Sequence, residues 1–209
     1  AVAPDHSGHG HDGVVTGAQW SQGQSGSGLL FESGKKASVQ IPSSAALDGS
    51  GRGLTLSAWV RWQGKGYQNT VLFKDQGYKM RVYKGSLYCA VQGSGKKMLW
   101  KGSEGGIVAN QWHHVACTHG ADGQIRTYID GVVSHTSGFV VEPAVMPSTP
   151  VVVGAQGKSS YFYGDIDEVL VFDDPLSDAR IAELASTDEG SGGEDEGSSG
   201  TLIYAATFG

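Results

Sequence analysis

The sequence lacks any long apolar segment. No run of about 18 apolar residues occurs, so no segment is predicted to span a membrane. Proline is also scarce, with 6 residues against 33 glycines. Many glycines between short apolar runs are typical of tight turns between strands. No signal peptide is visible, and we expect AVAPD to be an internal or processed start.

An excess of basic residues is lacking as well. The net charge is −6, and five acids and no base lie in residues 187–199. Without those five, 16 acids remain against 15 bases. A nucleic-acid-binding protein needs a basic face, so we exclude that partner. A nearly neutral domain is compatible with binding sugars or other proteins.

Cysteine is limited to two residues, Cys89 and Cys117, each within an expected strand. They would form a single disulfide in an exported domain, or remain two buried thiols in a reducing compartment. Their spacing along the chain does not fix their distance in space, so both alternatives stay open.

Alternating apolar residues are the dominant pattern. Residues 54–62 (LTLSAWVRW) place Leu54, Leu56, Ala58, Val60 and Trp62 on one face of a strand. About a dozen such strands follow one another at roughly 8–12-residue spacing, without intervening helices. The pattern predicts an all-β, two-sheet antiparallel β-sandwich of jelly-roll type with one short C-terminal helix.

The segment GDIDEVLVFDDPLSDARIAEL contains the last strand of this pattern and the helix. Strict alternation would put Asp165 and Asp167 on one face with Val169 and Val171. Ile166, Glu168, Leu170 and Phe172 would share the other face. Ser177 is the expected N-cap of a helix over residues 178–184. The two acids would serve either a catalytic strand or a closing strand that holds an ion or a terminus.

Composition divides the chain into three parts. Residues 1–185 are predicted to form one domain, and residues 186–200 an acidic Gly/Ser linker too polar to fold alone. Residues 201–209 (TLIYAATFG) are apolar again. They would start a following segment or domain, pair with an edge of this domain, or form an added tail. We favour the first.

The N-terminal loop DHSGHGHDG concentrates Asp5, His6, His9, His11 and Asp12. Their spacing is unlike that of zinc sites, which pair ligands from two separate places. A surface glycine loop is the favoured interpretation. An Asp with backbone carbonyls nearby suits Ca²⁺, which takes hard oxygen ligands.

The order of these motifs resembles the laminin-G-like, concanavalin A-like jelly roll. The resemblance is to its bacterial branch, often appended to polysaccharide-active enzymes and adhesins, and more distantly to pentraxins. It covers residues 5–184. The matching segments are DHSGHGHDGVVTGAQW, GLLFESGKKASVQIP, LTLSAWVRW, NQWHHVACTHGADGQIRTYIDGVV and GDIDEVLVFDDPLSDARIAEL.

The resemblance implies a structural calcium ion between the N-terminal loop and the last strand. Asp5 and Asp167 would supply side-chain ligands, and backbone carbonyls from Gly8 to His11 would complete the shell. Members of the family often have Asn in this loop, where this chain has His9 and His11.

Catalytic jelly rolls carry three acids on one strand face, as in E-x-D-x-E. Here the series is Asp165, Asp167 and Val169, and Glu168 points away, so an acid/base and nucleophile pair is not built. We therefore expect no enzymatic activity of this domain, although the parent chain can be an enzyme. A catalytic jelly roll, either a glycoside hydrolase or a polysaccharide lyase, is the third alternative.

A binding role requires aromatic rings that stack on sugars and polar groups that bind hydroxyls. The candidates are Tyr67, Tyr78, Arg81, Tyr83, Trp100 and Tyr161. We expect a lectin-like, carbohydrate-binding module of a larger secreted or cell-surface polysaccharide-processing protein, with a glycan as partner. The second alternative is a protein-interaction or adhesion domain.

Overall fold

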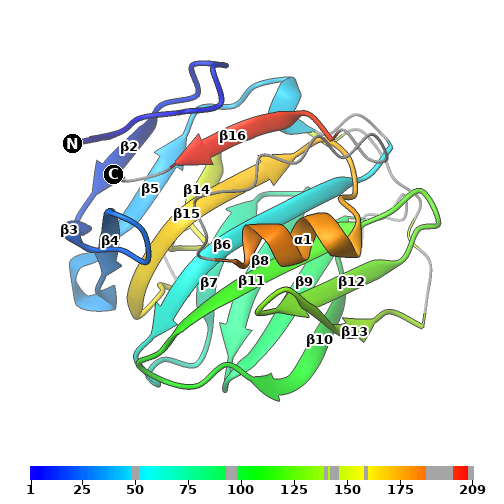
Figure 1. Ribbon diagram of the computed structural model, residues 1–209. Coiled ribbons are helices and arrows are strands. Elements are labelled where there is room, and N and C mark those ends of the chain that lie inside the picture. The colour runs from blue at the N-terminus through cyan, green and yellow to red at the C-terminus, as the bar shows by residue number, and fades with distance from the viewer. Residues whose placement is uncertain are drawn as a thin grey trace.

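Two antiparallel sheets of eight strands each stack into a sandwich (Figure 1). The computed structural model describes residues 1–48, 52–92, 98–138, 141, 146–157, 160–186 and 200–206. The predicted all-β jelly-roll architecture is confirmed. None of the helices in this described part has the length and apolarity needed to cross a bilayer.

The first sheet, sheet A, follows the order β1-β2-β5-β14-β7-β8-β9-β10. Its strands are β1 (Val2–Ala3), β2 (Gly13–Thr16), β5 (Ser38–Ile41), β14 (Val151–Val153), β7 (Asn69–Lys74), β8 (Tyr78–Tyr83), β9 (Ser86–Gln92) and β10 (Met98–Gly106).

The second sheet, sheet B, follows the order β13-β12-β11-β6-β15-β4-β3, and β16 also pairs with β15. Its strands are β13 (Val132–Thr136), β12 (Ile125–Ile129), β11 (Trp112–His119), β6 (Leu54–Trp62), β15 (Gly164–Phe172), β4 (Ser27–Phe31), β3 (Gln19–Gln22) and β16 (Leu202–Ala206). Two 3₁₀ turns, η1 (Ser33–Lys35) and η2 (Ala46–Asp48), connect strands.

Helix α1 (Asp178–Leu184) covers the outer face of sheet B (Figure 1). Ser177 is its N-cap and accepts a hydrogen bond from the Arg180 amide, as predicted. Ile181 packs in a second apolar cluster with Ala116, Tyr128, Phe172 and Leu176. Sheet B is therefore buried on both faces beneath the helix.

Strand β6 lies between β11 and β15 in sheet B. The five apolar residues that the sequence places on one face of this strand are all buried in the main core. On the other face, Thr55 and Ser57 are also buried. Ser57 Oγ lies 2.8 Å from His114 Nε2, so this polar pair is satisfied inside the protein.

Strand β15 departs from the strict alternation expected from its sequence. Its register with β6 shifts between Asp167 and Leu170, and Glu168 has a φ of 47°. This β-bulge moves Val169 and Val171 to the main core together with Ile166. Phe172 packs instead in the cluster beneath α1. The faces predicted for the side chains after Asp167 are therefore wrong. The bulge inserts one extra residue into the strand, so every later side chain points to the face opposite to the one that strict alternation predicts.

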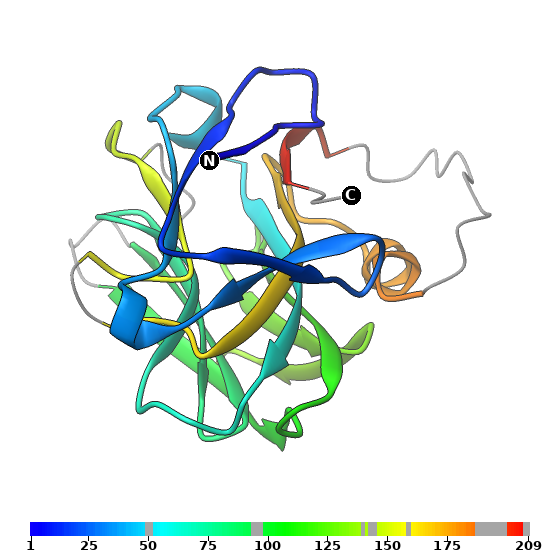
Figure 2. The ribbon, with the colours of Figure 1, turned by 90° about the vertical axis from the view of Figure 1, so that its left-hand side faces the viewer.

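From the sequence we favoured residues 201–209 as the start of a following segment. Residues 202–206 instead pair with an edge of this domain, which was the second alternative. They form β16, which pairs antiparallel with β15 and lies beside it in both views (Figures 1 and 2). Ile203, Tyr204 and Ala206 belong to the main core. Strand β4 pairs with β15 only at residues 164–166, so β16 completes the sheet along residues 169–172. The predicted linker lies largely outside the described residues.

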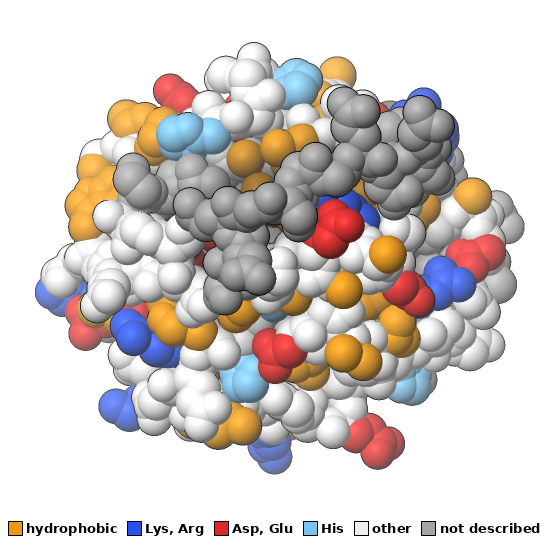
Figure 3. Space-filling model, in the orientation of Figure 1, with side chains coloured by type: hydrophobic (Ala, Val, Ile, Leu, Met, Phe, Trp, Pro, Cys, Tyr) orange, Lys and Arg blue, Asp and Glu red, His pale blue; other side chains and the backbone are white. Residues whose placement is uncertain are grey.

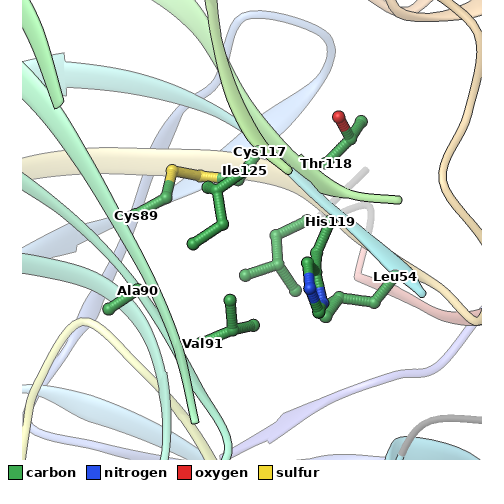
Figure 4. Close-up of a pocket in the computed structure, with 9 residues that line it drawn as sticks. Leu54, Cys89, Ala90, Val91, Cys117, Thr118, His119 and Ile125 are labelled. Carbon is green, nitrogen blue, oxygen red and sulfur yellow. A yellow bond between two sulfur atoms is a disulfide. The ribbon is translucent and has the colours of Figure 1, made fainter. Parts of the chain in front are cut away.

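Cys89 of β9 and Cys117 of β11 form a disulfide across the sandwich, with their Cα atoms 6.2 Å apart (Figure 4). The bond joins sheet A to sheet B. Beside it lies an apolar cavity of about 10 Å³, lined by residues that include Leu54, Val91 and His119. A cavity of this size is at the lower limit for a single water molecule, so it does not serve as a ligand site.

Candidate functional site

Strand β8 turns its polar side chains to the outer face of sheet A. The alternate residues Tyr78, Met80 and Val82 are buried in the main core. Lys79, Arg81 and Tyr83 therefore point the other way. A tight turn with Lys84 at a φ of 51° and Gly85 at 75° returns the chain into β9. The register of this hairpin places Tyr88 directly opposite Arg81.

The Arg81 guanidinium lies between two aromatic rings. Its Cζ atom is 5.8 Å from the centroid of the Tyr83 ring and 5.4 Å from that of Tyr88. Both distances are typical of cation–π contacts. The two rings meet edge to face, with centroids 5.9 Å apart. Arg81 is thus held in place by its neighbours across the hairpin.

Tyr67 extends this group from the loop between β6 and β7. The residue is 67 % exposed, and its ring meets Tyr83 edge to face at a centroid distance of 5.0 Å. A hydrogen bond with Tyr83 raises the pKa of the Tyr67 hydroxyl. We call Tyr67, Arg81, Tyr83 and Tyr88 the aromatic cluster. Tyr67 is exposed and Tyr83 and Tyr88 are partly exposed, so the cluster offers aromatic rings together with phenol groups, the combination that binds sugar rings.

An open depression of about 370 Å³ adjoins the aromatic cluster at Tyr67. It is also lined by Gly66, Gln68, Ser160, Tyr161 and Tyr163. Gly66 has a φ of 79°, and a Cβ atom there would lie 2.7 Å from the Tyr163 ring. Glycine is therefore required for the loop to approach this ring closely.

The floor beside the cluster is polar. Lys79 is only 1 % exposed, and its Nζ atom contacts the side-chain oxygen of Gln156. Nζ also lies 5.9 Å from the centroid of the Phe73 ring. Burial, aided by the nearby positive charge of Arg81, lowers the pKa of Lys79 to about 8.

Four of the six binding residues predicted from the sequence come together. Tyr67, Arg81 and Tyr83 are members of the cluster, and Tyr161 lines the adjoining depression. The prediction for the fifth residue, Tyr78, is wrong, because this side chain is not available to a ligand. Its ring is buried, and its hydroxyl donates to the Leu47 carbonyl at 3.4 Å, because Tyr78 occupies a core-facing position of β8.

The sixth predicted residue, Trp100, belongs to β10, but its side chain lies outside the described part of the structure. Sequence reasoning missed Tyr88. The signal was present, because a two-residue turn at Lys84 and Gly85 pairs Tyr83 with Ser86 and so places Tyr88 beside Arg81.

Sheet B also carries a group of aromatic and basic side chains: Arg61 lies over the Trp112 ring, and Trp59 meets His114 edge to face at 5.5 Å. Figure 3 shows the side of sheet B that carries α1, where acidic, basic and apolar side chains are interspersed. Trp20 belongs to β3, the last strand in the order of sheet B, and is 50 % exposed, whereas β8 and β9 belong to sheet A. The aromatic cluster is the better candidate for ligand binding, because Tyr67 is exposed beside an open depression, whereas Arg61 is paired with Asp165.

The Asp5 carboxylate, the first predicted calcium ligand, accepts hydrogen bonds from its surroundings. Donors are the Ser7 amide and hydroxyl, the His11 amide at 2.9 Å and the Ala205 amide at 3.1 Å. These bonds lower the pKa of Asp5 against the opposing effect of burial. Asp5 thereby ties the N-terminal loop to β16.

Asp167, the second predicted calcium ligand, is fully buried, and its carboxylate accepts hydrogen bonds from a different set of backbone amides. Its carboxylate accepts from the amides of Gln24 at 2.9 Å, Ser25 at 3.2 Å and Glu168 at 2.9 Å. The described residues include no group of three or more His, Cys, Asp or Glu placed to hold a metal. No described feature tests whether Asp5, Gly8, His9, His11 and Asp167 hold calcium, which stays a prediction.

Asp165, the other acid of β15, forms an ion pair. Its Oδ2 lies 3.1 Å from Arg61 Nε, and its Oδ1 accepts from the Ser21 hydroxyl at 2.8 Å. Arg61 also lies over the Trp112 ring at 5.1 Å. Both carboxylates of the GDID motif thus join β15 to neighbouring segments of the sandwich.

A family model described as the concanavalin A-like lectin/glucanases superfamily, Laminin_G_3, matches residues 33–182. The chain belongs to this superfamily. The matched range of this laminin-G-type domain contains the whole aromatic cluster and Asp167, but neither Asp5 nor β16. No curated protein sequence matches the chain.

Solved structures share the fold of this laminin-G-type domain. Domain 4 of AbnA, a GH43 extracellular arabinanase from Geobacillus stearothermophilus, was solved with arabinotriose. It has a TM-score of 0.69 and 20 % identity over 88 % of this chain and 93 % of that chain. The binding domain of Paraclostridial Mosquitocidal Protein 1 has a TM-score of 0.74 and 15 % identity over 88 % of this chain and 51 % of that chain.

Botulinum neurotoxin type C, whose cell entry depends on two ganglioside molecules, gives a TM-score of 0.68 and 16 % identity over 86 % of this chain and 47 % of that chain. This laminin-G-type domain therefore spans about half the length of the toxin chains. At these identities the likeness concerns the fold.

Proposed function

We propose that this laminin-G-type domain is a carbohydrate-binding module and that the aromatic cluster is its binding surface. The observation that carries the proposal is the arrangement of Tyr67, Tyr83 and Tyr88 around Arg81 on one outer face of sheet A. Aromatic rings stack on the apolar face of a sugar, while guanidinium and phenol groups bind its hydroxyls.

Two of the structural neighbours support this class of ligand. The arabinanase domain was solved with arabinotriose, and the botulinum neurotoxin depends on gangliosides for cell entry. Both ligands contain sugars presented as chains. The adjoining depression at Tyr161 and Tyr163 would extend the surface for a second sugar unit.

The setting that we propose is a larger secreted or cell-surface protein that processes polysaccharides. The Cys89–Cys117 disulfide supports export, because such bonds persist in oxidising compartments. In such a protein the module would hold the polysaccharide near a catalytic domain elsewhere in the chain, while this domain performs no chemistry.

A glycan array followed by calorimetric titration tests the proposal. The wild-type domain should bind one class of glycan, and Tyr67→Ala and Tyr83→Ala should each weaken that binding by about tenfold or more, since a stacked ring contributes on the order of 1–2 kcal/mol. Trp20→Ala is the matched control, because it removes an exposed ring outside the cluster. Absence of binding to every glycan contradicts the proposal.

A protein-binding function is the second candidate. Edge strand β13 carries Val132 and Val133, both exposed, beside an open depression of about 430 Å³. A structural neighbour, the botulinum neurotoxin DC binding domain, was solved with synaptotagmin II. Binding of a protein that Val132→Asp abolishes and Tyr83→Ala leaves unchanged would favour this alternative.

A further inference from the structure

The two cations of β8 lie side by side on the face that carries the aromatic cluster. Lys79 and Arg81 occupy alternate positions of the strand and share its outer face. Across the sheet, Phe73 pairs with Lys79 and Thr70 with Arg81. Both side chains therefore lie on the same face of sheet A as the aromatic cluster.

Lys79 is buried and Arg81 is partly exposed, so two like charges lie close together on this face. The pKa of Lys79 is lowered to about 8 by burial and by Arg81, and that of Arg81 is lowered by burial. The described groups that shift the pKa values of Lys79, Arg81 and Tyr67 are cations and phenols: Arg81, Lys84, Tyr67, Tyr83 and Tyr88. An anion at this place would relieve the repulsion.

A polar atom is available next to the guanidinium. Thr70 Oγ1 is buried and has no hydrogen-bond partner among the described residues. Thr70 lies opposite Arg81 in the β7–β8 pairing, and residues paired in this way share one face of a sheet. A buried hydroxyl without a partner is unusual in a folded protein, and a ligand group or a water molecule would complete it.

We infer that the ligand of the aromatic cluster is an acidic glycan whose carboxylate binds the Arg81 guanidinium, with the buried Lys79 on the same face of the strand. This inference rests on the proposed carbohydrate-binding function and specifies its ligand class. The planar guanidinium matches a carboxylate in two parallel hydrogen bonds, and Lys79 adds a point charge. The sugar ring that carries the carboxylate, a uronic or sialic acid, would then stack on Tyr83 or Tyr88.

Matched ligand pairs test the charge without changing the protein. The full chain is titrated with polygalacturonate and its methyl ester, and with sialyl-lactose and lactose. The acidic member of a pair that binds should bind at least tenfold more tightly. Equal binding of both members overturns the inference and leaves the proposed function intact. Binding of sulfated glycans alone also overturns it, and absence of binding to every glycan removes the proposed function itself.

A variant then locates the carboxylate. Arg81→Gln should abolish the preference, so that the ratio of the acidic to the neutral affinity falls to about one whatever the change in binding of the neutral member. Lys35→Gln is the matched control, because it removes an exposed cation from η1, outside the cluster. A preference that persists in a folded Arg81→Gln domain places the anion elsewhere and contradicts the inference. If this variant does not fold, the wild-type affinities for the free acid and for its methyl ester decide whether the ligand's carboxylate contributes to binding.

Discussion

The Arg81 guanidinium lies over the Tyr88 ring, with its Cζ atom 5.4 Å from the ring centroid. The two residues face each other across the β8–β9 hairpin, and Tyr83 and Tyr67 extend the contact toward the loop between β6 and β7. A surface held by such contacts is ordered before a ligand arrives, which reduces the conformational entropy lost on binding.

Tyr204 tests whether β16 is part of the fold. Its ring is fully buried in the main core, and its hydroxyl has no hydrogen-bond partner in the described structure. Tyr204→Ala should lower the free energy of unfolding by about 3–5 kcal/mol, as expected for a buried aromatic ring. Tyr204→Phe should leave it unchanged or raise it, because the isolated hydroxyl is removed. Urea denaturation measures both, and a Tyr204→Ala domain as stable as wild type contradicts the pairing of β16 with β15.

The disulfide should contribute measurably to stability. Cys89 and Cys117 are separated by 28 positions, and closing a loop of that length in the unfolded chain is worth about 3.5 kcal/mol in the chain-entropy account. Denaturation with and without reductant measures this contribution. The Cys89→Ala/Cys117→Ala variant is the control, and it should be insensitive to reductant. An equal midpoint for the oxidised and reduced wild type would show that the bond is absent.

The buried ring of His114 should make the domain less stable in acid. Burial lowers its pKa to about 4, and the charge of Asp130 opposes this only in part. Between pH 6.5 and 4 the unfolded chain binds a proton that the folded protein does not, so the free energy of unfolding falls as the pH falls. The loss from His114 is on the order of 3 kcal/mol at pH 4.

Denaturation at pH 7 and at pH 4.5 measures this effect, with His114→Gln as the comparison. The variant lacks the titrating ring and should lose less stability than wild type between the two values. Equal losses in the two proteins would assign the acid sensitivity to other groups.

The calcium prediction is tested by thermal melting. If calcium binds at the N-terminal loop, removing it with a chelator should lower the Tm, and adding calcium back should restore it. Asp5→Asn should abolish this response. A Tm that chelator leaves unchanged in a sample shown to be calcium-loaded contradicts the prediction, and Asp5 and Asp167 would then serve as acceptors for backbone amides.

The sequence predicted features that depend on local patterns. The alternation in residues 54–62 identified the central strand of sheet B, and Ser177 was identified as the cap of α1. Each of these features follows from neighbouring residues along the chain.

Features that depend on distant pairing were not predicted. The bulge at Glu168 reverses the faces of β15, and nothing in the local alternation reports it. The pairing of β16 depends on the space that β4 leaves beside β15. Tyr78 was assigned to the surface because a tyrosine is compatible with either face, and only the register of β8 decides between them.

The most direct test of the proposed function is the dissociation constant of Tyr83→Ala for the glycan that the wild-type domain binds, compared with that of Trp20→Ala. Tyr83 contacts Tyr67, Arg81 and Tyr88, so its removal disrupts the whole aromatic cluster. The account predicts a dissociation constant at least tenfold higher for Tyr83→Ala and an unchanged one for Trp20→Ala. Unchanged binding by a folded Tyr83→Ala domain would contradict it.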